Sequence, residues 1–149
     1  MKIINEMNLS FSSKSTNEGF ARSAVASFAL SLDPTINELA DIKTAVSEAV
    51  TNCIVHGYEM NAGTIYINAK ITDNSKIIIK IRDKGRGIED IEKAMEPLFT
   101  TAGGERAGLG FAVMQSFMDK VKVSSTVGKG TTVYMEKSII RNLSYEQKR

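Results

Sequence analysis

The change of hydrophobic period near Gly63 constrains the fold more than any other feature of this sequence. Apolar residues recur every three or four positions between residues 36 and 54, which is the spacing of one face of a helix. Between residues 65 and 81 apolar and polar residues alternate instead, with turn-forming residues at 73–75. The sequence therefore predicts a long amphipathic helix followed by an antiparallel hairpin.

Residues at the element boundaries predict where the first two helices begin and end. Ser15 and Glu18 have the spacing of a capping box, which indicates a first helix that reaches Asp33-Pro34. Thr35 can cap the long helix, which runs to His56-Gly57. Shorter patterns predict a strand in residues 1–10, a short helix near 88–95, an apolar helix near 109–118, and strands near 121–127 and 131–136.

The order of these elements indicates the fold class. Helices and strands arrive in blocks and not as repeated βαβ units, so we expect an α+β two-layer sandwich. Its helices should pack on one face of a mixed, mostly antiparallel sheet. We expect one domain over residues 1–140 and a polar C-terminal tail over 141–149, with no linker long enough to divide the chain.

Charge and cysteine content narrow the class of protein. The 19 basic and 17 acidic residues are mixed along the sequence and give a net charge of +2, without the basic block that a nucleic-acid footprint would need. Cys53 is the single cysteine, the N-terminus lacks a leader pattern, and no apolar stretch approaches the ~18 residues of a membrane span. We expect a cytoplasmic protein without direct nucleic-acid or membrane contact.

Three polar residues interrupt the apolar pattern of the long helix at intervals of four: Glu48, Asn52 and His56. This spacing places them one turn apart on one side of the helix. Taken alone, such a row is more often the solvated face of an amphipathic helix than a binding site.

Three glycine-rich segments favour a binding site over a plain solvated face. Asp83-Lys84-Gly85-Arg86-Gly87 follows an alternating strand, where a carboxylate can accept from an amino group and glycines allow a flat ligand to approach the backbone. Gly108-Leu109-Gly110 enters a helix whose amides could face phosphate oxygens. Gly130-Thr131-Thr132 begins the last strand. Each segment alone is as compatible with a plain turn, helix entry or strand start.

The order of the four segments in one short chain is more specific. E-A-V-T-N-x-x-x-H-G, D-x-G-x-G, G-L-G and G-T-T resemble the GHKL (Bergerat-type) ATPase and kinase superfamily shared by DNA gyrase, Hsp90, sensor histidine kinases and MutL. The resemblance covers nearly the whole chain. Neither a Walker A motif nor the G-x-G-x-x-G dinucleotide fingerprint is present.

The resemblance implies a site for ATP or ADP and Mg²⁺. By this resemblance Asn52 ligates Mg²⁺, and Glu48 orients or deprotonates the attacking hydroxyl. Asp83 holds the adenine amino group, Gly85 and Gly87 admit the base, and Thr132 assists through its hydroxyl or a water. The remaining nucleotide contacts that it implies are His56, Thr100, Thr101, Arg106, Gly108, Leu109 and Gly110, most of them in a lid over the triphosphate.

Features of the chain narrow the choice of subfamily. Its only histidine, His56, already belongs to the asparagine motif, so a separate phospho-acceptor histidine is missing and a histidine autokinase is disfavoured. The chain is similar to the anti-sigma serine kinases of endospore-forming bacteria. Its stretches N-E-x-F-A-R (17–22), E-P-L-F-T-T (96–101) and R-A-G-L-G-F (106–111) are closest to the sporulation branch.

The resemblance also implies partners. They are a sigma factor of the sigma-F type, an anti-anti-sigma protein phosphorylated on serine, and a second copy in a homodimer. Arg22 would contact both protein partners, although without the resemblance it is an ordinary exposed helix charge. Two alternatives stay open: an equivalent kinase for another sigma factor, such as the general-stress one, and an ATP-gated binding module without kinase activity.

Overall fold

The computed structural model describes residues 1–96 and 107–140. Strands and helices alternate in blocks along the chain, as the hydrophobic patterns predict. The elements are β1 (Ile3–Ser12), α1 (Thr16–Ala29), the 3₁₀ turn η1 (Leu30–Leu32), α2 (Ile36–Asn52), the π-helical turn η2 (Cys53–Gly57), β2 (Thr64–Thr72), β3 (Lys76–Asp83), α3 (Ile91–Ala94), α4 (Ala107–Phe117), β4 (Lys120–Thr126) and β5 (Gly130–Ser138).

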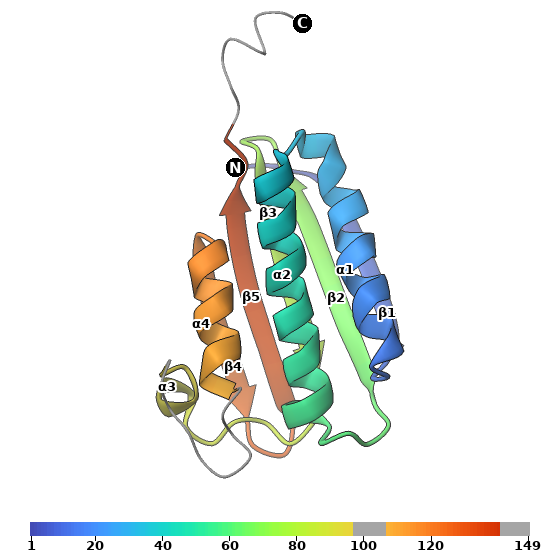
Figure 1. The fold of residues 1–149 in the computed structure, drawn as a ribbon, viewed down its shortest axis with the longest axis vertical. Coiled ribbons are helices and arrows are strands. Elements are labelled where there is room, and N and C mark those ends of the chain that lie inside the picture. The colour runs from blue at the N-terminus through green and yellow to red at the C-terminus, as the bar shows by residue number, and fades with distance from the viewer. Residues whose placement is uncertain (97–106, 141–149) are drawn as a thin grey trace, which may run out of the picture.

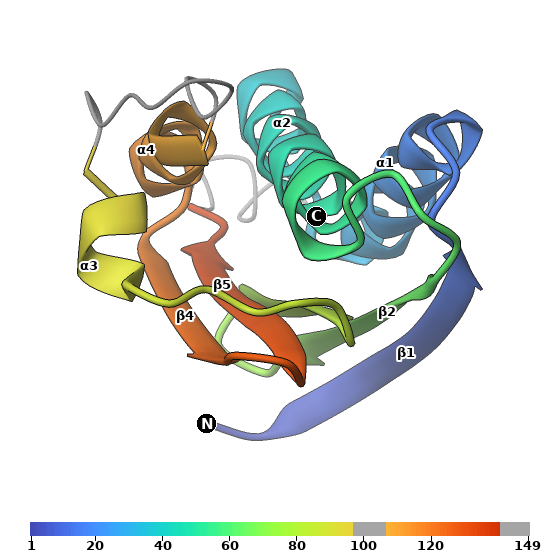
Figure 2. The same ribbon diagram turned by 90° about the horizontal axis from the view of Figure 1, so that it is seen from below.

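The molecule has two layers. One is a five-stranded sheet in the order β1-β2-β3-β5-β4, and α1, α2 and α4 lie side by side on one of its faces (Figures 1 and 2). This confirms the α+β sandwich. The sheet that the described residues form is entirely antiparallel and not mixed, because each of its four strand pairs is antiparallel. No helix in these residues is long and apolar enough to cross a membrane.

The central helix, α2, begins at the predicted cap. The Thr35 hydroxyl accepts a hydrogen bond from the Glu38 amide at 3.0 Å, and the Glu38 carboxylate accepts one from the Thr35 amide at 2.9 Å, which completes a capping box. The buried residues that follow pack α2 between α1 and α4: Ile42, Ala45, Val46, Ala49 and Val50. Ile36 shares their spacing but is 87% exposed in the first turn.

The predicted capping box at the start of α1 is wrong. Ser15 has helical backbone angles (φ −55°, ψ −32°) and makes no side-chain cap hydrogen bond, whereas a capping residue needs an extended backbone. The Glu18 carboxylate pairs instead with Arg22 one turn later, at 3.0 Å. The side-chain amide of Asn17 donates to the Ser12 carbonyl at 2.9 Å and ties the start of α1 to the end of β1.

Strand alternation divides the sheet into an apolar and a basic face. Ile77, Ile79 and Ile81 of β3 pair with Lys137, Met135 and Val133 of β5, and these positions face the helices. The residues between them face outward. Six basic residues that are scattered in the sequence therefore share the outer face: Lys70, Lys76, Lys80, Arg82, Lys120 and Lys122.

Candidate functional site

The C-terminal part of α2 carries the first cluster of predicted site residues. Glu48 and Asn52 lie one turn apart, and the α-helix changes to the wider π turn η2 directly after Asn52. A π turn inserts an extra residue into the helical ladder, and such turns are frequent at functional sites. His56 lies within this turn, so the regular spacing of four that the sequence suggests is interrupted between Asn52 and His56.

Gly110 of α4 completes this cluster. A Cβ atom at Gly110 would lie 3.1 Å from Oδ1 and 3.2 Å from Nδ2 of Asn52, and 3.4 Å from Oε2 of Glu48. The α4 backbone therefore passes directly over both side chains. The predicted contacts Gly108 and Leu109 lie in the first turn of the same helix.

Asn52 carries an unpaired polar atom. Its side-chain nitrogen is buried and is the one such atom in the described part of the chain without a hydrogen-bond partner. Leaving a buried amide unpaired costs roughly 1–3 kcal/mol. A buried group left unpaired at this cost points to a strained or functional position.

Asp83, at the end of β3, forms the second cluster. Its side chain is only 4% exposed, and Oδ1 accepts a hydrogen bond from the Gly85 amide at 2.9 Å. On the other side lies Gly57, the last residue of η2, where a Cβ atom would be 2.7 Å from Oδ2 of Asp83. The π turn that starts after Asn52 thus ends against the carboxylate of Asp83 and connects the two clusters.

Burial shapes the electrostatics around Asp83. It raises the pKa of the carboxyl group above its ordinary value, although hydrogen bonds from the Gly85 amide, the Cys53 thiol and the Thr131 backbone offset part of this rise. Burial also raises the pKa of the Cys53 thiol, and the charge and hydrogen bonding of Asp83 add to the effect. Cys53 is therefore a neutral donor to Asp83.

Gly85 and Gly87 allow the loop after β3 to pack closely on neighbouring backbone. A Cβ atom at Gly85 would lie 2.0 Å from the Gly57 carbonyl oxygen, and one at Gly87 (φ +80°) would lie 2.4 Å from the Thr126 carbonyl oxygen. The Arg86 amide donates to Gly57 at 2.9 Å. Both glycines thus have a structural reason to lack a side chain, and their role in admitting a base stays a prediction.

The structure places Thr132 away from Asp83. In the antiparallel register Thr132 pairs with Arg82, and it lines a shallow hollow on the outer face with Tyr66 and Lys80. The residue that pairs with Asp83 is Thr131, which is 9% exposed on the helix side. Sequence reasoning missed Thr131. It lies two residues before the core-facing Val133, and in a strand this spacing places both side chains on the same face, which could have indicated that Thr131 faces the helices.

The other predicted residues lie apart or outside the described residues. Arg22, on α1, donates to Glu18 at 3.0 Å and to Ser47 of α2 at 3.3 Å, and is not part of either cluster.

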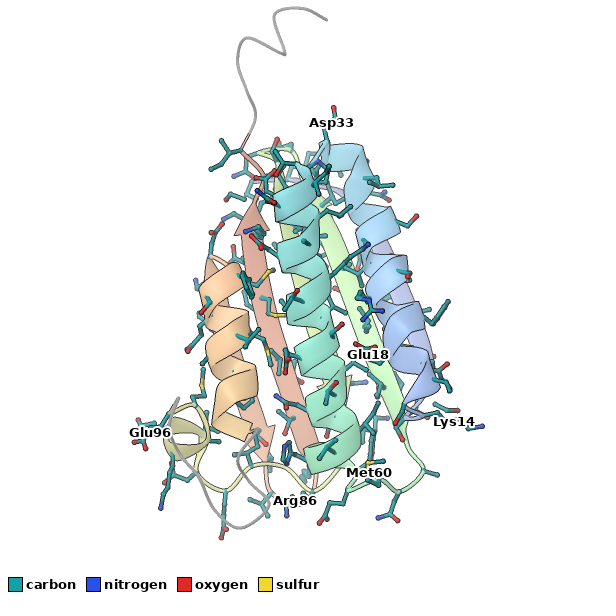
Figure 3. The ribbon with its side chains drawn as sticks, viewed as in Figure 1. Lys14, Glu18, Asp33, Met60, Arg86 and Glu96 are labelled. Carbon is teal, nitrogen blue, oxygen red and sulfur yellow. The ribbon has the colours of Figure 1, made fainter. Side chains whose placement is uncertain are left out.

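Thr100, Thr101 and Arg106 lie outside the described residues, as does the side chain of Leu109. Figure 3 shows Arg86, from the loop that follows β3, at the end of the molecule opposite to Asp33.

Comparisons with known proteins agree with this architecture. Residues 11–137 match the family described as histidine kinase-like ATPase domain. An anti-sigma F factor of Caldanaerobacter subterraneus subsp. tengcongensis is 64% identical over 143 residues, which cover 95% of this chain and 99% of the relative. The anti-sigma F factor of Clostridium acetobutylicum is 57% identical over 89% of this chain and 93% of the relative.

Solved structures share the fold at low sequence identity. The RsbU and RsbW domains of Rv1364c from Mycobacterium tuberculosis match with a TM-score of 0.67 and 17% identity, over 91% of this chain and 32% of that one. Full-length ShkA in complex with AMPPNP matches with a TM-score of 0.55 and 19% identity, over 86% and 30% of the two chains. These structures show the shared fold, and the sequence matches establish that the chain belongs to the histidine kinase-like ATPase domain family and, within it, to the anti-sigma F factors.

Proposed function

We propose that this protein binds and inhibits a sigma factor of the sigma-F type and uses Mg-ATP to phosphorylate a serine of an anti-anti-sigma partner. One observation carries the catalytic half of the proposal: Glu48 and the unpaired amide of Asn52 lie together beneath Gly110 of α4. The names of relatives at 57–64% identity support the sigma-F half. They favour it over a kinase for another sigma factor.

Asp83 is suited to hold the adenine end of the nucleotide. A buried carboxylate accepts hydrogen bonds only, so it complements the amino group of adenine and opposes the carbonyl oxygen of guanine. The Gly85 amide fixes one carboxylate oxygen at 2.9 Å. Thr131, which faces Asp83 across the strand pair, takes the assisting role that the resemblance gave to Thr132.

Asn52 is suited to contribute to a Mg²⁺ site together with a nucleotide. Its side-chain oxygen, which lies beside Gly110, would be the ligand, because Mg²⁺ prefers a few protein oxygens combined with phosphate and water ligands. Within residues 1–96 and 107–140, no three His, Cys, Asp or Glu side chains gather into a metal site. Any Mg²⁺ held at Asn52 would accordingly share its coordination with the nucleotide.

Glu48 is suited to act on the incoming serine. When bound, ATP supplies the phosphoryl group, and the protein contributes mainly by positioning and by stabilising charge. Glu48 lies one turn from Asn52 and would orient the serine hydroxyl or accept its proton. Arg106, in the segment before α4, would neutralise charge on the transferred group.

The partner surface is proposed around Arg22 on α1. Its side chain is 42% exposed and pairs with Glu18 within the same helix, so it can exchange this partner for one on another protein. We also propose that residues 1–140 form one functional domain, that residues 141–149 are a tail, and that the protein acts in the cytoplasm as a homodimer.

Nucleotide-dependent partner binding tests this proposal. Calorimetry with ATP or ADP in the presence of Mg²⁺ should give saturable binding, and immobilised sigma factor should retain the protein in a nucleotide-dependent manner. A protein that binds no adenine nucleotide would contradict the proposal. Nucleotide-dependent sigma-factor binding without phosphoryl transfer would leave only the ATP-gated binding module.

A further inference from the structure

Ser125 of β4 connects three backbone segments at the adenine end of the candidate site. Its hydroxyl accepts a hydrogen bond from the Ile88 amide at 2.7 Å, donates one to the Gly130 carbonyl oxygen at 3.0 Å, and lies 2.8 Å from the Thr131 hydroxyl. Ile88 belongs to the segment between β3 and α3, which passes along the ends of β4 and β5 (Figure 2). Ser125 therefore links the loop that follows β3, through Ile88, to the start of β5, through Gly130 and Thr131.

The strand register places Ser125, Thr131 and Asp83 in one row. Ser125 pairs with Thr131 across β4 and β5, and Thr131 pairs with Asp83 across β5 and β3. Directly opposite residues of paired strands point to the same face of a sheet. Thr131 consequently lies between the hydroxyl of Ser125 and the carboxylate of Asp83 on the helix side of the sheet.

The hydrogen-bond inventory limits how these hydroxyls can be arranged. A serine hydroxyl has one proton and two lone pairs, and the Ile88 amide occupies one lone pair of Ser125. If Ser125 donates to Gly130, its second lone pair accepts the proton of Thr131. If Ser125 donates to Thr131, the proton of Thr131 stays available to a ligand.

A direct hydrogen bond from Thr131 to adenine requires the second arrangement, in which the Ser125 proton turns from Gly130 to Thr131. Its amino group is a donor, which matches the carboxylate of Asp83, and the neighbouring ring nitrogen N1 is an acceptor that needs a donor. We propose that Ser125 is a positioning residue for adenine recognition, which adapts to the adenine-bound state by turning its proton from Gly130 to Thr131 and so holds the proton of the Thr131 hydroxyl towards N1. This inference rests on the proposed function, because it assumes that Asp83 binds adenine.

The position of N1 gives a direct test. Binding of ADP and of 1-deaza-ADP, in which a C–H group replaces N1, is measured by calorimetry for the wild type, Ser125→Ala and Ser125→Thr. One hydrogen bond is worth about 0.5–1.5 kcal/mol, so the wild type should prefer ADP by roughly 2- to 10-fold. The preference should fall towards one in Ser125→Ala and return in Ser125→Thr, which keeps the hydroxyl.

Two controls separate positioning from general damage. Ser124→Ala removes a hydroxyl from the neighbouring, outward-facing position of β4 and should leave the preference unchanged. Thr131→Val removes the hydroxyl through which Ser125 would act, so adding Ser125→Ala to it should cause little further loss of ADP affinity. If Ser125→Ala does not fold, Ser125→Cys, with its weaker donor, takes its place.

The outcomes distinguish this inference from the proposed function. An unchanged preference for ADP over 1-deaza-ADP in Ser125→Ala, or additive losses in the double variant, would overturn the role of Ser125 alone. A wild type that binds no ADP would overturn the adenine site and this role with it. A wild type that binds ADP and 1-deaza-ADP equally would overturn the contact with N1 and leave adenine binding by Asp83 intact.

Discussion

Gly110 lies against Asn52 so closely that a Cβ atom at position 110 would be 3.1 Å from the side-chain oxygen of Asn52. Contacts of this length require a neighbour to shift by a few tenths of an ångström. The lack of a side chain at Gly110 therefore allows the carboxamide of Asn52 and the carboxylate of Glu48 to occupy their present positions. This contact joins α2 to α4, the helix that follows the predicted lid.

Gly110→Ala should separate activity from stability. Alanine is favoured over glycine inside a helix by about 1 kcal/mol, so the melting temperature should stay equal or rise. Phosphoryl transfer should nevertheless fall by roughly tenfold or more, because small displacements of catalytic groups are costly. Gly19→Ala in α1 is the matched control for stability, since its Cβ would make an ordinary 3.6 Å contact with Arg22. Wild-type transfer by Gly110→Ala would refute this role.

Exchange of the two neighbouring threonines should have unequal effects. Thr131→Val should weaken ADP binding by roughly 2- to 10-fold, because it removes the hydroxyl opposite Asp83. Thr132→Val changes the outer face and should leave ADP affinity unchanged. Calorimetric titration of both variants with ADP decides between the two threonines. A loss of ADP affinity confined to Thr132→Val would assign the adenine contact to Thr132 on the outer face of the sheet.

Asp83→Asn should weaken nucleotide binding and alter the pH dependence of stability. Because the folded-state pKa of Asp83 is raised, its contribution to the free energy of unfolding is fully present below the unfolded pKa, about 3.9, and is lost as pH rises through the folded pKa. Wild type should therefore lose stability relative to Asp83→Asn as pH rises from 4 towards neutrality. Denaturant unfolding at several pH values measures this difference, and a constant difference would contradict the raised pKa.

Arg22→Ala should affect partner binding only. The ion pair with Glu18 is a half-exposed pair within one helix, worth about 0.3–0.5 kcal/mol, so unfolding should change little. Sigma-factor and substrate binding should weaken strongly while ADP affinity stays the same. Glu18→Gln removes the same ion pair but keeps Arg22, and should retain partner binding. If Arg22→Ala binds the sigma factor and the substrate as tightly as the wild type does, Arg22 is not part of the partner interface.

Local patterns predicted most of the fold because one side of each element is buried. Alternation gave the hairpin of β2 and β3, and Thr35 correctly marked the start of α2. The capping box at Ser15 failed because Ser15 takes helical backbone angles, which the motif spacing does not reveal, and Glu18 pairs with Arg22 one turn later. The outer basic face was missed because it depends on strand pairing and not on neighbours in the sequence.

The site was predictable as a set of segments but not as a geometry. The spacing of Glu48 and Asn52 follows from the helix itself, whereas no pattern in the sequence predicts the π turn after Asn52, which ends with Gly57 against Asp83. The sequence could not show that Thr131 and not Thr132 lies opposite Asp83, because the register with β3 is a tertiary property. The network around Ser125 likewise joins residues from separate elements, and no spacing within the sequence indicates it.

Transfer of labelled phosphate tests the central claim most directly. The protein is incubated with Mg²⁺, γ-labelled ATP and an anti-anti-sigma protein, and the labelled residue is identified by mass spectrometry. We expect label on a partner serine with the wild type. Glu48→Gln should lower the rate of transfer by roughly 100-fold or more and should leave ADP affinity nearly unchanged. Absence of label with a wild type that binds ATP, or an undiminished rate with Glu48→Gln, would contradict the account.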